Sequence, residues 1–137
     1  MTPPITDMRL LGQLFRYPEG DYAKEVGDFI FASNSAMINC TIDCLALQPH
    51  QKVLEIGFGN GKHLPYLFKK ESSLQYIGVE TSSAMITEAT EYNNVLVGLQ
   101  KVHFLEVAAD ELPNFDYSFD VCFSVNTLYF LENPLYY

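Results

Sequence analysis

The stretch VLEIGFGNGKHL, residues 53–64, places three glycines within five positions, directly after a short apolar run. In a parallel α/β sheet, ligands bind at the carboxyl ends of the strands, where the first strand turns into its helix. A side chain in that turn would block close approach of a ligand, and sharp turns often need φ values that only glycine adopts without strain. Gly57, Gly59 and Gly61 therefore predict a backbone cradle for an extended ligand.

The spacing of these glycines narrows the kind of ligand. The dinucleotide fingerprint G-x-G-x-x-G would place its third glycine at position 62, which is Lys62. The phosphate-loop pattern also fails, because no G-K-[ST] follows the glycines. The remaining pattern is E-x-G-x-G-x-G, in which Glu55 stands two residues before three alternating glycines.

The segments around the glycines alternate between strand and helix patterns. A long helix is expected from about Asp21, a plausible N-cap after Gly20, to Leu47. Ser82 or Ser83 is expected to cap a later helix. This order predicts a doubly wound, mostly parallel α/β domain over residues 20–137, after an N-terminal arm over residues 1–19. The expected strands are 52–56, 74–80, 101–106 and 119–125, and the expected helices between them are 62–70 and 82–92.

Two further acids follow the predicted second and third strands. Glu80 ends the second strand, where a carboxylate can accept hydrogen bonds from both hydroxyls of a ribose. Asp110 follows the third strand and could accept from an exocyclic adenine amine. Both acids are expected at the same edge of the sheet as the glycines, which predicts a site for an adenosine-containing ligand.

The charge balance is acidic, with 17 Asp and Glu against 8 Lys and Arg in 137 residues, for a net charge of −9. Such a chain tends to repel phosphate backbones and anionic lipid, so neither a nucleic acid nor a membrane is expected as a partner. The N-terminus MTPPITDMRLL lacks a signal peptide, and no apolar run approaches membrane-spanning length. With Cys40, Cys44 and Cys122 interpreted as buried and reduced, the expected location is cytoplasmic.

Three motifs in order give the chain a resemblance to a known family. VLEIGFGNGKHL, YIGVETSSAMITEA and AADELPNFDYSFDVCFSVNTLYFLENP resemble the successive motifs of class I S-adenosylmethionine-dependent methyltransferases. They are most similar to the small-molecule branch with a methyltransferase-11-like domain. The resemblance implies a Rossmann-like sheet, S-adenosylmethionine as the cofactor and in-line transfer of a methyl group to an acceptor, expected to be a small molecule.

The resemblance also implies roles for individual residues. The glycines would line the methionine moiety, Glu55 would orient its amino group, and Glu80 would hold the ribose hydroxyls. No catalytic residue and no metal site is implied, and His63 is expected to decorate the first helical turn rather than act as a base. Tyr17 and Asn34 are candidate contacts from a covering N-terminal helix. The full set of expected cofactor contacts is Glu55, Gly57, Phe58, Gly59, Gly61, Glu80, Thr81, Met85, Ala109, Asp110 and Asn126.

The chain departs from the family pattern at LENPLYY, residues 131–137, where a further helix and further strands would be expected. The sequence therefore predicts a C-terminally truncated domain whose fourth strand is an open edge, available for self-association. Alternatives to an active methyltransferase are a non-catalytic module that binds S-adenosylmethionine or S-adenosylhomocysteine, and an inactive fragment of a longer enzyme. An NAD-dependent oxidoreductase is a more distant alternative.

Overall fold

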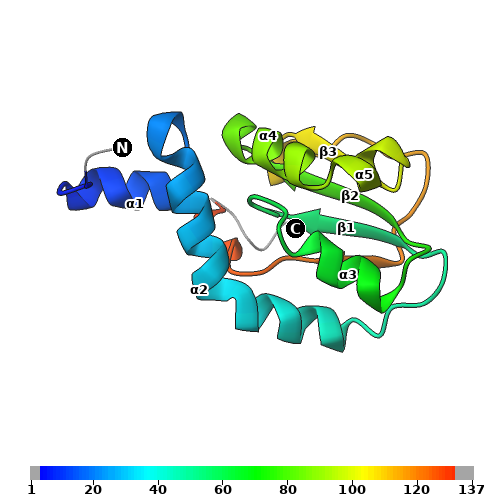
Figure 1. The fold of residues 1–137 in the computed structure, drawn as a ribbon. Helices are drawn as coiled ribbons and strands as arrows, with labels where there is room; N and C mark the ends of the chain where they lie inside the picture. The colour runs from blue at the N-terminus through cyan, green and yellow to red at the C-terminus, as the bar shows by residue number, and fades with distance from the viewer. Residues whose placement is uncertain (1–3, 132–137) are drawn as a thin grey trace.

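The fold is built on a parallel sheet of four strands, seen in a computed structural model that describes residues 4–131 (Figure 1). Residues 132–137, most of the C-terminal segment LENPLYY at which the sequence departs from the family pattern, lie outside the described residues. The strands lie in the order β3-β2-β1-β4, and all three pairings are parallel. The predicted Rossmann-like α/β fold is confirmed. The strands are β1 (Lys52–Ile56), β2 (Gln75–Glu80), β3 (Val102–Glu106) and β4 (Val121–Phe123).

The order of the strands fixes where a ligand can bind. From β1 the chain adds β2 and β3 on one side, and it then returns to place β4 on the other side of β1. The crevice at such a reversal is the usual ligand site in open α/β sheets. Because Gly57 directly follows β1, the glycine-rich turn lies at this reversal.

Helices of the chain bury one face of the sheet. They are α1 (Met8–Arg16), α2 (Ala23–Cys44), α3 (Leu64–Lys70), α4 (Ser83–Tyr92) and α5 (Asn94–Gly98), with single 3₁₀ turns at Gly20–Tyr22, Ala109–Glu111 and Leu128–Phe130. Ile42 of α2 and Leu64 and Leu67 of α3 join Val53 and Tyr76 of the sheet in one buried cluster. In Figure 1, α2 crosses the end of the sheet and continues toward α3. The long helix is thereby held beside the glycine-rich turn.

The predicted element boundaries hold where the apolar pattern is strong. β1 has the predicted bounds, and Ser82 caps α4 by accepting a hydrogen bond from the Met85 N–H at 3.2 Å. The prediction of Asp21 as a helix N-cap is wrong. Asp21 lies in the 3₁₀ turn before α2, and the residue at the N-cap position, Tyr22, makes no capping hydrogen bond with its side chain.

Two further elements differ from the sequence-based expectation. β4 covers three residues instead of the predicted seven, and side-chain hydrogen bonds flank it at both ends. The Asp120 carboxylate accepts from the Lys52 N–H at 2.7 Å, and the Ser124 hydroxyl donates to the Ile56 carbonyl at 2.9 Å. The short helix α5 was not predicted, since residues 94–98 have too few positions to show a helical period.

The three cysteines are free and exposed, so the prediction that they are buried is wrong. None of the helices within residues 4–131 is both long enough and apolar enough to cross a bilayer.

Candidate functional site

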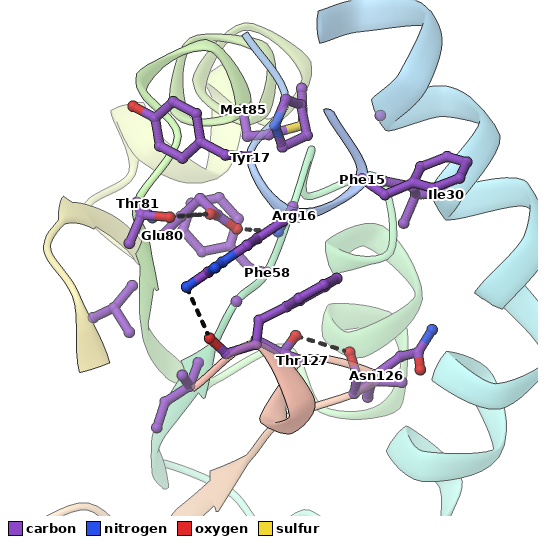
Figure 2. A pocket seen from close by; sticks show the side chains of 18 of the residues that line it. Phe15, Arg16, Tyr17, Ile30, Phe58, Glu80, Thr81, Met85, Asn126 and Thr127 are labelled. Atoms are coloured by element: carbon purple, nitrogen blue, oxygen red, sulfur yellow. Dashed lines mark hydrogen bonds between the residues drawn. The ribbon is translucent and has the colours of Figure 1, made fainter. Parts of the chain in front are cut away.

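A cavity of about 920 Å³ opens at the carboxyl ends of the strands (Figure 2). Its lining includes Ile56 at the end of β1, Glu80 at the end of β2, Val107 just after β3 and Val125 just after β4. The C-terminal end of α1 and one side of α2 cover the cavity, and their lining residues include Phe15 and Ile30. This volume lies within the range of sites that enclose a small ligand or cofactor.

The three glycines of the turn all have left-handed backbone, with φ of 74° at Gly57, 62° at Gly59 and 65° at Gly61. A Cβ on Gly59 would meet no atom within 4 Å, because this glycine faces the open cavity. A Cβ on Gly57 would lie 2.5 Å from the Thr127 side chain, so its bare backbone lets the segment after β4 approach. Gly61 does not line the cavity. It faces α4, where a Cβ would lie 2.9 Å from that of Ala89.

Glu80 connects the end of β2 to the glycine-rich turn. Its Oε2 accepts from the Gly59 N–H at 3.0 Å, and its Oε1 accepts from the Thr81 N–H at 2.8 Å. Figure 2 shows this carboxylate inside the cavity, with Phe58 and Thr81 beside it. The side chain thus braces the turn and presents a negative charge to whatever occupies the cavity.

Glu55 is buried in the floor of the cavity, with 2% of its surface exposed. Its Oε2 receives two hydrogen bonds, from His63 Nε2 at 2.7 Å and from the Tyr76 hydroxyl at 2.6 Å. Burial raises the pKa of Tyr76 well above its ordinary value, and the negative charge of Glu55 raises it further. Tyr76 therefore stays a protonated donor to Glu55.

The residues predicted beside adenine lie together on the β2–β3 side of the cavity. Met85 of α4 and Ala109 of the 3₁₀ turn after β3 are buried, whereas Thr81 and Asp110 are exposed. All four line the cavity, as does Phe58, whose ring packs against Phe104 with centroids 4.6 Å apart. This part of the cavity combines apolar walls with the carboxylates of Asp110 and Glu111, which both line it.

The outer end of the cavity is closed by the segment after β4 and the N-terminal helices. Asn126, at a left-handed φ of 57°, donates its amide to Asn34 Oδ1 of α2 at 3.0 Å. Arg16 reaches across the mouth to the Phe130 carbonyl at 3.4 Å (Figure 2). Arg16 is the one lysine or arginine among the described residues that line the cavity. Tyr17 also lines the cavity, but it lies near Met85 and Thr81, away from Asn126 (Figure 2), so the two sequence-predicted lid residues line different parts of the cavity.

A polar network attaches α2 to the glycine-rich turn. Asp28 of α2 accepts from the Asn60 amide at 3.1 Å and pairs with the Lys62 ammonium group. Lys24, one turn earlier, pairs with Glu88 of α4 at 3.3 Å. Burial alone would raise the pKa of Asp28, but the hydrogen bond and charge of Lys62 hold it below its ordinary value. The cover of the cavity is thus tied to the turn that forms its floor.

The structure brings ten of the eleven predicted contact residues to one cavity and leaves Gly61 outside it. It also adds residues that the sequence analysis set aside or did not consider. His63 is buried against Glu55 instead of lying on the helix surface, and Asn60 bridges the turn to α2. The contact between Glu55 and Tyr76 could have been found only from the register of the two parallel strands, which places both side chains on one face of the sheet.

Comparisons with known proteins agree with this geometry. The sequence profile of a family described as methyltransferase domain matches residues 53–136. A tRNA U34 carboxymethyltransferase of Vibrio vulnificus is 28% identical over 86 residues, which are 63% of this chain and 26% of that protein. The chain thus spans about a quarter of the length of the curated relatives it matches.

Solved structures share the fold. A methyltransferase from Geobacter sulfurreducens, solved with S-adenosylhomocysteine, is 20% identical, with a TM-score of 0.57 over 69% of this chain and 37% of that one. A putative methyltransferase from Haloferax volcanii, in complex with the Trm112 methyltransferase activator, is 18% identical. Its TM-score is 0.73 over 96% of this chain and 52% of that one.

These relatives contradict the predicted partners. The sequence analysis expected a small-molecule acceptor and no nucleic acid, whereas the curated relatives are named as enzymes of tRNA. One structural neighbour is bound to an activator protein, a kind of partner that was not expected. The expectation of a small-molecule acceptor rested on the resemblance to the small-molecule branch. The expectation of no nucleic acid rested on the net charge of −9, which says nothing of what a longer protein or a partner contributes.

Proposed function

This chain belongs to the class I S-adenosylmethionine-dependent methyltransferase family, and we propose that its cavity holds the cofactor for in-line transfer of a methyl group. The observation that carries the proposal is that residues from separate strands and loops line the same cavity. The open backbone at Gly59 and the carboxylates of Glu55, Glu80 and Asp110 all line one cavity at the carboxyl ends of the strands. S-adenosylmethionine has an ammonium group, two ribose hydroxyls and an adenine amine that match acceptors in this set.

The chain's residues fit the cofactor in an extended arrangement. The amino-acid part would lie over Gly57 and Gly59, with its ammonium group toward Glu55. The ribose hydroxyls would donate to Glu80, and the adenine would lie between the apolar walls near Met85. A Cβ on Gly59 would project into this cavity, so we place the closest approach of the cofactor to the backbone there. The remaining contacts proposed for the cofactor are Phe58, Thr81, Ala109, Asp110 and Asn126.

The chemistry requires positioning more than a reactive side chain. The cofactor supplies a carbon already activated by its sulfonium, so the chain needs no nucleophile of its own. Alignment of two reacting groups can contribute about 7–11 kcal/mol to lowering the barrier. The backbone after β4 and the Asn34–Asn126 amide pair lie at the outer end of the cavity, where an acceptor would enter. We assign alignment of the acceptor to these groups.

We propose a nucleobase of RNA as the acceptor, in line with the names of the tRNA-modifying relatives. Aromatic side chains at the outer end, including Phe15, Tyr129 and Phe130, offer faces on which an unstacked base can stack. A net charge of −9 does not favour the phosphate backbone. We therefore place backbone binding on protein outside this chain, either further sequence of a longer enzyme or a partner protein.

A transfer assay tests this acceptor. The chain is incubated with S-adenosylmethionine labelled on its methyl group and with unmodified tRNA, and label in the RNA is counted after digestion to nucleosides. We expect label in one nucleoside, and its loss when Glu80 is replaced by alanine. Label that stays with the cofactor, under conditions where the chain binds both S-adenosylhomocysteine and the tRNA, would contradict an RNA acceptor. A spectrophotometric titration with NADH addresses the oxidoreductase alternative, and we expect no binding.

A further inference from the structure

Three buried side chains in the floor of the cavity form a cluster in which two hydrogen-bond donors meet one carboxylate oxygen. His63 Nε2 and the Tyr76 hydroxyl lie 2.7 Å and 2.6 Å from Oε2 of Glu55. The exposed fractions of Glu55, His63 and Tyr76 are 2%, 3% and 0%. Glu55 and His63 line the cavity, while Tyr76 supports Glu55 from beneath it.

The sheet register explains how a tyrosine reaches this carboxylate. Tyr76 pairs with Val53 and Gly78 pairs with Glu55, so Tyr76 lies two residue pairs before Glu55, on the same face of the sheet. A Cβ on Gly78 would lie 2.9 Å from the Tyr76 hydroxyl oxygen and 2.5 Å from the Phe58 ring. The bare backbone at Gly78 therefore leaves the space through which the Tyr76 side chain extends to Glu55.

The hydrogen bonds of the cluster are divided unequally between the two oxygens of Glu55. Both donors bind Oε2, and no residue within 4–131 donates to Oε1 of Glu55. A carboxylate oxygen can accept two hydrogen bonds, and an ionised carboxylate shielded from water is costly unless a cation or further donors meet it. No lysine or arginine within the described residues pairs with Glu55. The geometry leaves Oε1 for a cation that enters with the ligand.

We propose that His63 and Tyr76 are positioning residues that hold Oε2 of Glu55 and so direct Oε1 at an ammonium group of the ligand in the cavity. This rests on the proposed function, under which that group is the α-amino group of the cofactor. Two bonds on one oxygen fix both the rotation of the carboxylate and its place in the floor. Without them, the carboxylate turns, and the ligand ammonium loses a short, charge-assisted hydrogen bond.

Four proteins test the proposal: the wild type, Tyr76→Phe, His63→Leu and His63→Gln. Each is titrated by calorimetry with S-adenosylhomocysteine and with the analogue in which hydrogen replaces its α-amino group. We expect the wild type to prefer the amino ligand by about 10- to 100-fold, the range for a hydrogen bond to a charged group. Tyr76→Phe and His63→Leu should reduce this preference to below about fivefold, with little change in affinity for the analogue.

The glutamine variant keeps an N–H donor at position 63, so it should restore most of the preference that leucine removes. Tyr66→Phe is a matched control, because the Tyr66 hydroxyl donates to Asp43 away from the cavity, and it should keep the wild-type preference. Tyr76→Phe retains the ring that fills the core, and thermal unfolding checks that each variant is folded.

An equal loss of affinity for both ligands in Tyr76→Phe and His63→Leu would overturn the proposal, because it would make the two residues merely structural. A wild type that binds both ligands equally well would also overturn it. A wild type that binds neither ligand would instead contradict the proposed function, so the two failures are distinguishable.

Discussion

Replacing Glu80 with alanine is expected to lower the affinity of the chain for S-adenosylhomocysteine by about 30- to 150-fold, or about 2–3 kcal/mol. The substitution removes the acceptor proposed for the ribose hydroxyls. It also removes the carboxylate that holds the Gly59 and Thr81 amides at 3.0 Å and 2.8 Å, so the turn loses a brace. Calorimetric titration of the folded variant measures the change in dissociation constant.

Glu106→Ala is the matched control for this substitution. Glu106 pairs with Glu80 in the sheet register and likewise ends its strand, but it is exposed and does not line the cavity. Its replacement should leave the dissociation constant within about twofold, as for surface substitutions in general. An unchanged affinity in Glu80→Ala, or an equal loss in both variants, would remove Glu80 from the site.

Alanine at Gly61 is expected mainly to lower the stability of the fold, whereas alanine at Gly59 is expected mainly to weaken ligand binding, although both glycines have nearly the same φ. A left-handed non-glycine residue costs about 1–2 kcal/mol of stability, so both variants should lose at least that amount. At Gly61 the new methyl group also meets Ala89 at 2.9 Å, which adds about 1–3 kcal/mol of overpacking. Gly61→Ala should therefore be the less stable variant in urea unfolding.

At Gly59 the new methyl group meets no protein atom within 4 Å and projects into the cavity. Gly59→Ala should fold with only the backbone strain, yet bind S-adenosylhomocysteine at least tenfold more weakly, a loss of about 1.4 kcal/mol or more. Calorimetry at a temperature where both variants are folded compares their affinities. If Gly61→Ala were the weaker binder and the more stable protein, the assignment of the two glycines would be reversed.

The sequence predicts the framework of the site well because its signals are local. The apolar run at 52–56 ends at Gly57, so the bounds of β1 follow from adjacent residues. The position of Glu80 at the end of the next strand follows in the same way, and parallel strands bring their carboxyl ends to one edge. Ser82 is identifiable as a cap because capping depends on residues within one helical turn.

The sequence does not predict contacts that depend on strand register or on helix placement. His63 looks like a surface residue from its position after the glycines, but its burial depends on Glu55 eight residues earlier and on the space above β1. Gly61 shares the spacing of the other glycines, yet it faces α4, and only the path of the turn decides which glycine faces the cavity. Arg16 joins the cavity because α1 ends at its mouth.

The most direct test of the central claim is a crystal structure of the chain with S-adenosylhomocysteine. The account predicts the ligand in the cavity at the carboxyl ends of β1 and β2, with ribose hydroxyls about 2.5–3.0 Å from the Glu80 carboxylate and the amino group beside Oε1 of Glu55. A ligand bound elsewhere on the chain, or one in this cavity that touches neither carboxylate, would contradict it.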